Sequence, residues 1–221
     1  VPDMSPAVRN PQITERSIVI VGAGGHAKVL IDLLHASGEF DVAGLVDRTT
    51  APGTMVNGVP VLGPDSPEHL ATLRKSGIAH GANAVGGIRD RSLRPAVWER
   101  LRAAGFALPT LVHPRANIDR SARLADGVQV LAGAYVGAEA SVGADSIVNT
   151  NAVVSHDCVL DEHVNIAPGA LVAGGVHIGT NTLVGMGVTI YLGLRIGAGV
   201  VISNGAAVFD DVPDGTLVRS R

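Results

Sequence analysis

The chain has 221 residues, a formal net charge of −3, 46% hydrophobic residues and 3% aromatic residues, which suits two packed domains. Without a basic run or a long apolar segment, it is expected to bind neither nucleic acid nor a membrane. The single cysteine cannot form an internal disulfide and there is no signal peptide, so we expect a cytoplasmic protein.

The first half of the chain alternates between strand and helix patterns. Residues 1–16 hold three prolines and are expected to form a flexible tail. Helices are predicted from Val29 through Leu34, at 67–75 and at 91–104, and strands at 17–21, 42–46, 59–62, 82–85 and 109–112. This alternation predicts a small, parallel α/β domain over residues 17–113, with the boundary at His113-Pro114.

A glycine-rich loop follows the first predicted strand. Gly22, Gly24 and Ala27 match the spacing G-x-G-x-x-A, and Asp47 ends the next strand twenty residues further on. The glycines let backbone N–H groups approach a phosphate at a helix N-terminus, and the carboxylate can hold a ribose hydroxyl or a base. A nucleotide-sugar diphosphate, NAD and a structural turn remain open, and the small domain favours the first. His26 is a packing or ligand-contact residue.

The second half of the chain repeats every six residues. From Ile118 to Val208 every sixth residue is aliphatic, and a small or β-branched residue follows four places later, with Leu194 as the exception. A period of six fits neither an α-helix nor an alternating strand, and it indicates a parallel β-helix with three hexads per coil. Residues 114–221 are predicted to form a little over five coils. Glycines such as Gly137 are attributed to tight corners where a negative φ would be costly.

One histidine in the hexad region lies next to an acid. His156 comes two residues after the inward Val154 and should point outward at a corner, where Asp157 can fix its tautomer and raise its basicity. A solvated surface pair remains an alternative. One coil further on, Gly174 should leave a backbone N–H exposed to a thioester oxygen. Cys158 falls on an inward position and is expected to be buried packing, not an acyl-carrying nucleophile.

Several segments of the chain carry a family resemblance when they are taken together. They are residues 22–28, 47, 84–87, 105–106, 112–114, 149–158, 166–169 and 173–174. This combination resembles the sialic-acid O-acyltransferase and bacillosamine-type sugar N-acetyltransferase family of hexapeptide-repeat acyltransferases, and it covers nearly the whole chain from Ser17. The resemblance implies a mixed fold, in which a small Rossmann-like α/β domain is followed by a left-handed parallel β-helix. It also implies a homotrimer with an acetyl-CoA groove between adjacent subunits.

The resemblance also implies roles for individual residues of this sequence. His156 would be the catalytic base, with Asp157 orienting it and Asn149 as a nearby polar side chain. Asn165 stands where many relatives have a histidine, and its amide can still form a hydrogen bond to the cofactor. No metal is implied. The remaining cofactor contacts fall on Ala173, Gly174 and Gly175, and the substrate contacts fall on Gly22, Gly24, Gly25, His26, Asp47 and Gly86.

The sequence therefore predicts an acetyl-CoA-dependent N-acetyltransferase acting on the amino group of a nucleotide-linked deoxy-amino sugar. Direct attack on the thioester is favoured because no exposed nucleophile accompanies His156. O-acetylation of a sialic acid or another sugar by the same base remains open. So does a non-catalytic nucleotide-sugar-binding trimer, which would be expected to lack the His-Asp pair. A β-helix carbonic anhydrase is disfavoured because His156, His163 and His177 show no regular zinc-binding spacing.

Overall fold

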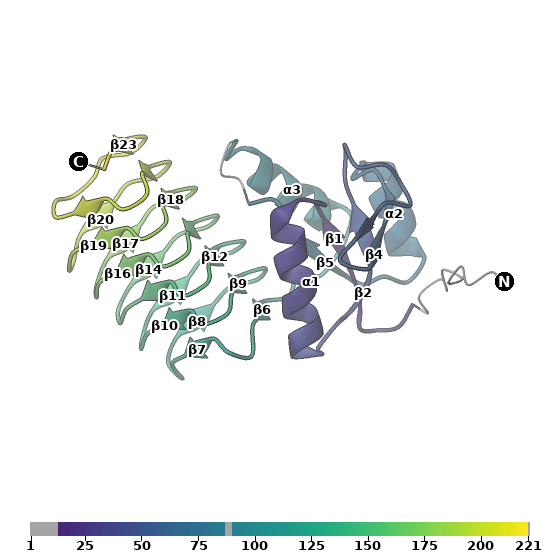
Figure 1. Cartoon of the computed structure of the whole chain (residues 1–221), viewed down its shortest axis with the longest axis horizontal. Helices are drawn as coiled ribbons and strands as arrows, with labels where there is room; N and C mark the ends of the chain where they lie inside the picture. The colour runs from purple at the N-terminus through teal and green to yellow at the C-terminus, as the bar shows by residue number, and fades with distance from the viewer. Residues whose placement is uncertain (1–12, 87–89, 221) are drawn as a thin grey trace, which may run out of the picture.

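The computed structural model describes residues 13–86 and 90–220 of the chain. Residues 1–12 of the predicted tail at 1–16 lie outside the described residues. Gly87, the last residue of the segment 84–87, also lies outside them. An α/β domain lies beside the first coils of a β-helix, and helix α1 runs next to the start of that β-helix (Figure 1). The predicted fold class, a small α/β domain followed by a left-handed parallel β-helix, is confirmed.

The α/β domain contains one five-stranded sheet of order β3-β4-β2-β1-β5. The prediction of a wholly parallel sheet is wrong at one edge, because β3 pairs antiparallel with β4. The turn between them is Asn57-Gly58, with φ of 45° and 77°, a dipeptide typical of tight hairpins. The last strand of this sheet also begins two residues earlier than predicted. The elements are β1 (Ser17–Val21), α1 (Gly25–Ser37), β2 (Asp41–Val46), β3 (Met55–Val56), β4 (Val59–Gly63), α2 (Pro67–Lys75), β5 (His80–Asn83) and α3 (Leu93–Ala103).

Strand β1 is buried on both faces because its residues alternate between two cores. Ile18 and Ile20 pack with residues of α1, whereas Val19 and Val21 pack with Trp98 and other residues on the opposite side. Helices on both faces of parallel strands explain why the strand reads as an unbroken aliphatic run. The glycine loop that follows β1 is therefore held at the edge of a rigid sheet.

The β-helix consists of two-residue strands in three parallel sheets. We call the seven-stranded sheet the interface sheet, because the α/β domain packs on it. It contains β6 (Leu111–Val112), β9 (Gln129–Val130), β12 (Ile147–Val148), β15 (Asn165–Ile166), β18 (Leu183–Val184), β21 (Val201–Ile202) and β23 (Leu217–Val218). The six-stranded sheet contains β7 (Asn117–Ile118), β10 (Tyr135–Val136), β13 (Val153–Val154), β16 (Leu171–Val172), β19 (Thr189–Ile190) and β22 (Ala207–Val208). The five-stranded sheet contains β8 (Arg123–Leu124), β11 (Ser141–Val142), β14 (Val159–Leu160), β17 (His177–Ile178) and β20 (Arg195–Ile196).

The hexad pattern matches the core of the β-helix. Inward aliphatic residues from Val130 to Ile202 are buried, and the small residues between them, such as Ala140 and Ala152, are completely buried. The predicted strand at 109–112 belongs to this β-helix and not to the α/β sheet, since Val112 pairs with Val130. Val112 lies six residues before Ile118, so it extends the hexad series by one position.

The structure corrects the reason given for the corner glycines. Gly137 and its equivalents do not have positive φ, which occurs two residues later, at Gly or at residues such as Glu139 and Asp157. A Cβ atom on Gly137 would lie 2.7 Å from the backbone nitrogen of His156 in the next coil. The glycine is therefore required by the close stacking of coils and not by a left-handed backbone.

A buried polar network joins the two domains. Arg94 Nη2 lies 2.9 Å from Asp145 Oδ1, with side-chain exposures of 3% and 0%, as an ion pair without an aligned hydrogen bond. Asn83 Nδ2 and His163 Nδ1 donate to the same carboxylate at 3.1 Å and 3.0 Å. Burial lowers the pKa of Arg94, and the charge of Asp145 opposes this effect. The single tryptophan, Trp98, packs against Gly127 of the β-helix at the same interface.

Candidate active site

Six of the predicted binding residues line one pocket in the α/β domain. Its cavity volume is about 480 Å³, and it opens where β1 and β2 end and α1 begins. Gly86, Asp90 and Leu93, the first residue of α3, also line the pocket. The structure thus brings together residues that are far apart in the sequence, namely Gly22, Gly24, Gly25, His26, Asp47 and Gly86.

The glycines of this pocket have different functions. Gly22 has a φ of +113°, and a Cβ atom there would lie 3.2 Å from the carbonyl carbon of Ala84, so the fold itself requires glycine. Gly24 and Gly25 have no such constraint, since a Cβ atom at either would meet nothing within 4 Å. Gly24 caps α1 without a side-chain hydrogen bond, which leaves the first N–H groups of the helix open to an anion.

Asp47 holds the glycine loop in place. Its Oδ2 accepts a hydrogen bond of 3.0 Å from the backbone N–H of Ala23, and its Oδ1 accepts from Thr49 and Thr50. Burial opposes ionisation, but the hydrogen bonds from Thr49 and Thr50 outweigh it and lower the pKa of the carboxyl. The structure therefore gives Asp47 a supporting contact with the loop, and its predicted contact with the nucleotide stays a prediction.

His26 is the one titratable pocket residue with a strongly shifted pKa. Burial lowers the pKa of its imidazole to about 4, the positive charge of Arg94 acts in the same direction, and a hydrogen bond to Gln129 opposes both. The imidazole is therefore neutral at pH 7. A neutral histidine can bind a ligand as a hydrogen-bond partner without adding charge to the pocket.

The His156–Asp157 pair lies on the surface of the β-helix. His156 Nδ1 is 2.7 Å from Asp157 Oδ2, and each side chain is 64% exposed. Because an ionised carboxylate only accepts hydrogen bonds, Nδ1 carries the hydrogen, and in the neutral form of the ring Nε2 then has a lone pair. Asp157 reaches this position because the corner gives it a φ of 59°. The pair can act as an oriented base.

Gly174 in the next coil lies directly against the imidazole of His156. A Cβ atom on Gly174 would be 2.5 Å from Cε1 and Nε2 of His156, so only glycine allows this position of the ring. The expectation of an exposed amide at Gly174 is corrected, because the residue is buried beneath the ring. Its N–H has no hydrogen-bond partner among residues 13–86 and 90–220, while Gly175 N–H donates to the carbonyl of His156 at 2.9 Å.

Two of the other predicted residues of the β-helix, Asn149 and Asn165, lie away from His156. Asn149 lies at the corner before β13, whereas His156 follows that strand, so the two occupy different corners of one coil. Asn165 is in the interface sheet, where its Nδ2 donates to the carbonyl of Gly86 at 2.9 Å. Within one chain Asn165 thus contacts the wall of the pocket, and its cofactor contact stays a prediction. Ala173 lies beside Gly174 and accepts a hydrogen bond from Cys158 Sγ.

Cys158 is a packing residue, as predicted. It is completely buried, and burial raises the pKa of its thiol, which makes the nucleophilic thiolate less accessible at neutral pH. Within the described ranges no three His, Cys, Asp or Glu side chains cluster as metal ligands. No helix in those ranges is long and apolar enough to cross a bilayer.

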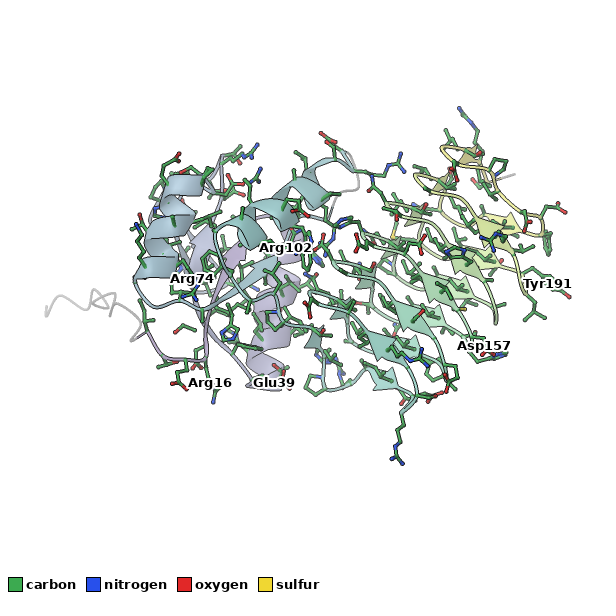
Figure 2. All side chains as sticks on the ribbon, turned by 180° about the vertical axis from the view of Figure 1, so that it is seen from behind. Arg16, Glu39, Arg74, Arg102, Asp157 and Tyr191 are labelled. Atoms are coloured by element: carbon green, nitrogen blue, oxygen red, sulfur yellow. The ribbon has the colours of Figure 1, made fainter. Side chains whose placement is uncertain are left out.

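The pocket and the His156–Asp157 pair lie on opposite sides of one chain. The three sheets form the sides of a triangular prism, and His156 is on the edge between the six- and five-stranded sheets. We call this the free edge (residues 137–139, 155–157, 173–175, 191–193 and 209–211), because it lies opposite the interface sheet. Figure 2 shows Asp157 and Tyr191 at the outer side of the β-helix, far from the α/β domain.

The sequence interpretation missed the residues that join the pocket to the β-helix. Gln129 contacts His26, and the buried Arg94 donates a hydrogen bond to the carbonyl of Val85, which lines the pocket. One signal was available, since Gln129, Ile147 and Asn165 occupy outward positions of one sheet yet are buried. Because one coil has eighteen residues, these three residues lie above one another on the outer surface of the interface sheet. An outward-facing column that contains an aliphatic residue beside uncharged amides indicates that another domain packs on that sheet.

Comparisons of sequence match parts of the chain. Residues 17–101 match the PglD N-terminal domain family. The UDP-N-acetylbacillosamine N-acetyltransferase of Bacillus subtilis is 31% identical over 118 residues, which is 53% of this chain. The matched region spans about half (52%) of that relative's own length.

Comparisons of structure cover both domains. A mutant form of the GDP-perosamine N-acetyltransferase of Caulobacter crescentus, in complex with CoA and GDP-perosamine, is 39% identical, with a TM-score of 0.86, over 92% of this chain and 93% of that one. The acetyltransferase domain of PglB from Neisseria gonorrhoeae, in complex with acetyl coenzyme A, is 36% identical, with a TM-score of 0.85, over 92% and 96%. The chain belongs to the family of sialic-acid O-acyltransferases and bacillosamine-type sugar N-acetyltransferases, which carry a left-handed β-helix of hexapeptide repeats.

Proposed function

We propose that this protein is an acetyl-CoA-dependent N-acetyltransferase that acts on the amino group of a nucleotide-linked amino sugar. The observation that carries the proposal is the exposed His156–Asp157 pair, in which Nδ1 and Oδ2 are 2.7 Å apart. The pair lies on a glycine-lined edge of the β-helix that is typical of the family. The related Caulobacter structure with CoA and GDP-perosamine supports both proposed ligands. No metal takes part in the proposed reaction.

In the proposed mechanism, the amine attacks the thioester carbonyl directly. His156 Nε2 takes a proton as the new C–N bond forms, and Asp157 stabilises the resulting imidazolium. When the C–S bond breaks, the imidazolium returns that proton to the leaving thiolate, so the products are the amide and free CoA.

Turnover on a panel of nucleotide-linked sugars tests this function. With acetyl-CoA, we expect acetylation of at least one UDP-, GDP- or dTDP-linked 4-amino sugar, followed by release of free CoA thiol. Matched sugars with a hydroxyl in place of the amine should react far more slowly. Faster acetylation of a hydroxyl sugar would favour the sialic-acid type of O-acetylation, and no turnover of any sugar would reject the enzyme assignment.

We expect Gly24→Val to weaken binding of the sugar nucleotide selectively. The variant protein should fold, since a Cβ atom at this position meets nothing within 4 Å. The valine side chain would, however, occupy the space that a phosphate needs at the start of α1. Steady-state kinetics should show a KM for the sugar nucleotide raised at least about tenfold, or about 1.4 kcal/mol, with the KM for acetyl-CoA nearly unchanged. Equal increases in both constants would argue for a structural loop. Gly22→Val, which clashes with Ala84, should fail to fold and serves as the contrast.

The pocket and the His156–Asp157 pair lie on opposite sides of one chain. This separation supports a homotrimer in which neighbouring subunits together form each active site. A sugar nucleotide in the pocket of one chain lies on the opposite side of the β-helix from that chain's own His156. The free edge also exposes large apolar side chains, with Tyr191 58%, Leu192 55% and Phe209 68% exposed. Exposed apolar patches of this kind are typical of contact surfaces. A second copy could cover them and complete the site.

Mixing two inactive variants tests whether the active site is shared. His156→Ala removes the base and should leave about 1% of the activity. Gly24→Val obstructs the pocket and, at low sugar nucleotide concentration, should leave about 10% or less. Co-expressed mixed oligomers should recover activity, because some interfaces combine an intact pocket with an intact His156 from the neighbour. Absence of recovery in mixed oligomers confirmed by mass spectrometry, or an active monomer in light scattering, would contradict the shared site.

A further inference from the structure

The histidine of the glycine loop is connected to the β-helix through one glutamine. His26 Nε2 lies 2.7 Å from Gln129 Oε1, and Gln129 Nε2 donates a hydrogen bond of 2.8 Å to the carbonyl oxygen of Asn83. Gln129 is only 1% exposed and belongs to β9 of the interface sheet. A wall residue of the pocket is therefore fixed by a buried side chain of the other domain.

These contacts determine the orientation of the Gln129 amide and the tautomer of His26. A carbonyl oxygen only accepts hydrogen bonds, so the group of Gln129 beside Asn83 must be the NH2. Gln129 Oε1 therefore faces His26, and because this oxygen also only accepts, His26 Nε2 must carry the hydrogen. In the neutral imidazole the second nitrogen, Nδ1, then keeps its lone pair.

Nδ1 of His26 is available to a ligand. It has no hydrogen-bond partner among the residues that the structure describes, and it is not among the nitrogen atoms sealed from solvent. His26 lines the pocket in the first turn of α1, directly after Gly24 and Gly25. A diphosphate at this helix N-terminus would place the adjoining sugar next to the imidazole.

We propose that Gln129 fixes His26 as the Nε2–H tautomer, so that Nδ1 presents a constant, uncharged hydrogen-bond acceptor to a hydroxyl or amino group of the sugar beside the diphosphate. This inference rests on the proposed function, because it takes a nucleotide-linked sugar as the occupant of the pocket. His26 is the substrate contact that the family resemblance already implies, and Gln129 is a positioning residue that acts through it. A sugar without a donor at that place would leave Nδ1 unpaired and would be rejected.

Two substitutions of His26 separate its two nitrogens. The side-chain oxygen of asparagine can replace Nδ1, whereas glutamine reaches further and can replace only the Nε2 donor. By calorimetry, His26→Gln should raise the Kd of GDP-perosamine on the order of tenfold, while His26→Asn should keep most of the affinity. GDP alone should bind both variants as it binds the original protein. Unchanged affinity of His26→Gln for GDP-perosamine, or an equal loss for GDP, would overturn the proposal.

The tautomer is measured directly in the protein without ligand. Nitrogen-15 NMR of the imidazole rings, with His26→Asn to assign the signal, should show the Nε2–H form at neutral pH. In Gln129→Met this preference should be lost, and the KM for the sugar nucleotide should rise more than that for acetyl-CoA. An Nδ1–H form, or an unchanged tautomer in Gln129→Met, would overturn the inference and leave the proposed function intact. A fixed Nε2–H tautomer in a protein that binds none of the nucleotide-linked sugars would reject the proposed function, and the ligand contact with it.

Discussion

Replacing His156 by alanine is expected to lower kcat by about 100-fold or more, because general-base catalysis commonly contributes 10²–10⁴-fold. The side chain is 64% exposed and lies against Gly174, so its removal should leave the core intact. The free energy of unfolding should therefore change by less than about 0.5 kcal/mol. Steady-state kinetics and urea unfolding of the same preparation measure the two effects separately.

Two neighbouring substitutions act as controls for the base. Asp157→Asn should reduce kcat less than His156→Ala, because it disturbs the orientation and basicity of the imidazole without removing it. Asparagine also tolerates the left-handed backbone at this corner, where φ is 59°. Cys158→Ala should keep most of the activity, since the thiol is buried and donates to the carbonyl of Ala173. Near-normal turnover of His156→Ala, or a folded but inactive Cys158→Ala, would contradict direct attack.

The β-helix could be predicted because its physical cause is local and repeats. Each inward side chain, such as Val136 or Val154, meets its equivalent one coil away, so one rule fixes the whole core. The corner glycines were interpreted incorrectly for a related reason. Gly137 is constrained by the backbone of His156 nineteen residues later, and a rule based on its own φ cannot express that contact.

The halves of the candidate site could be predicted, but their relative positions could not. The spacing of Gly22 and Gly24 indicates a phosphate loop, and the His156-Asp157 dipeptide indicates a base, because each depends on neighbours in the sequence. The glycine loop and the His156–Asp157 pair lie on opposite sides of one chain because the α/β domain packs against one particular sheet of the three. The choice is made by buried contacts between distant residues, such as Asn83 and Asp145.

The interdomain ion pair is expected to be the most sensitive point for stability. Asp145→Asn keeps the shape of the side chain and tolerates the left-handed φ of 55°, but it leaves the guanidinium of Arg94 buried without a counter-charge. Breaking a buried pair in this way typically costs about 3–5 kcal/mol. Urea unfolding followed by the fluorescence of Trp98, which packs at the same interface, measures this loss.

A matched pair on the surface provides the control for this prediction. Glu139 occupies an equivalent corner with a φ of 58°, and it pairs with Arg123 at 3.0 Å, but the two side chains are 55% and 75% exposed. Glu139→Gln should therefore change the free energy of unfolding by less than about 1 kcal/mol. Adding Arg94→Met to Asp145→Asn should restore part of the lost stability, because it removes the stranded charge. The prediction is contradicted if Asp145→Asn lowers the free energy of unfolding no more than Glu139→Gln does. It is also contradicted if Arg94→Met lowers the free energy of unfolding as much in the Asp145→Asn protein as it does alone. In either case the buried pair does not hold the domains together.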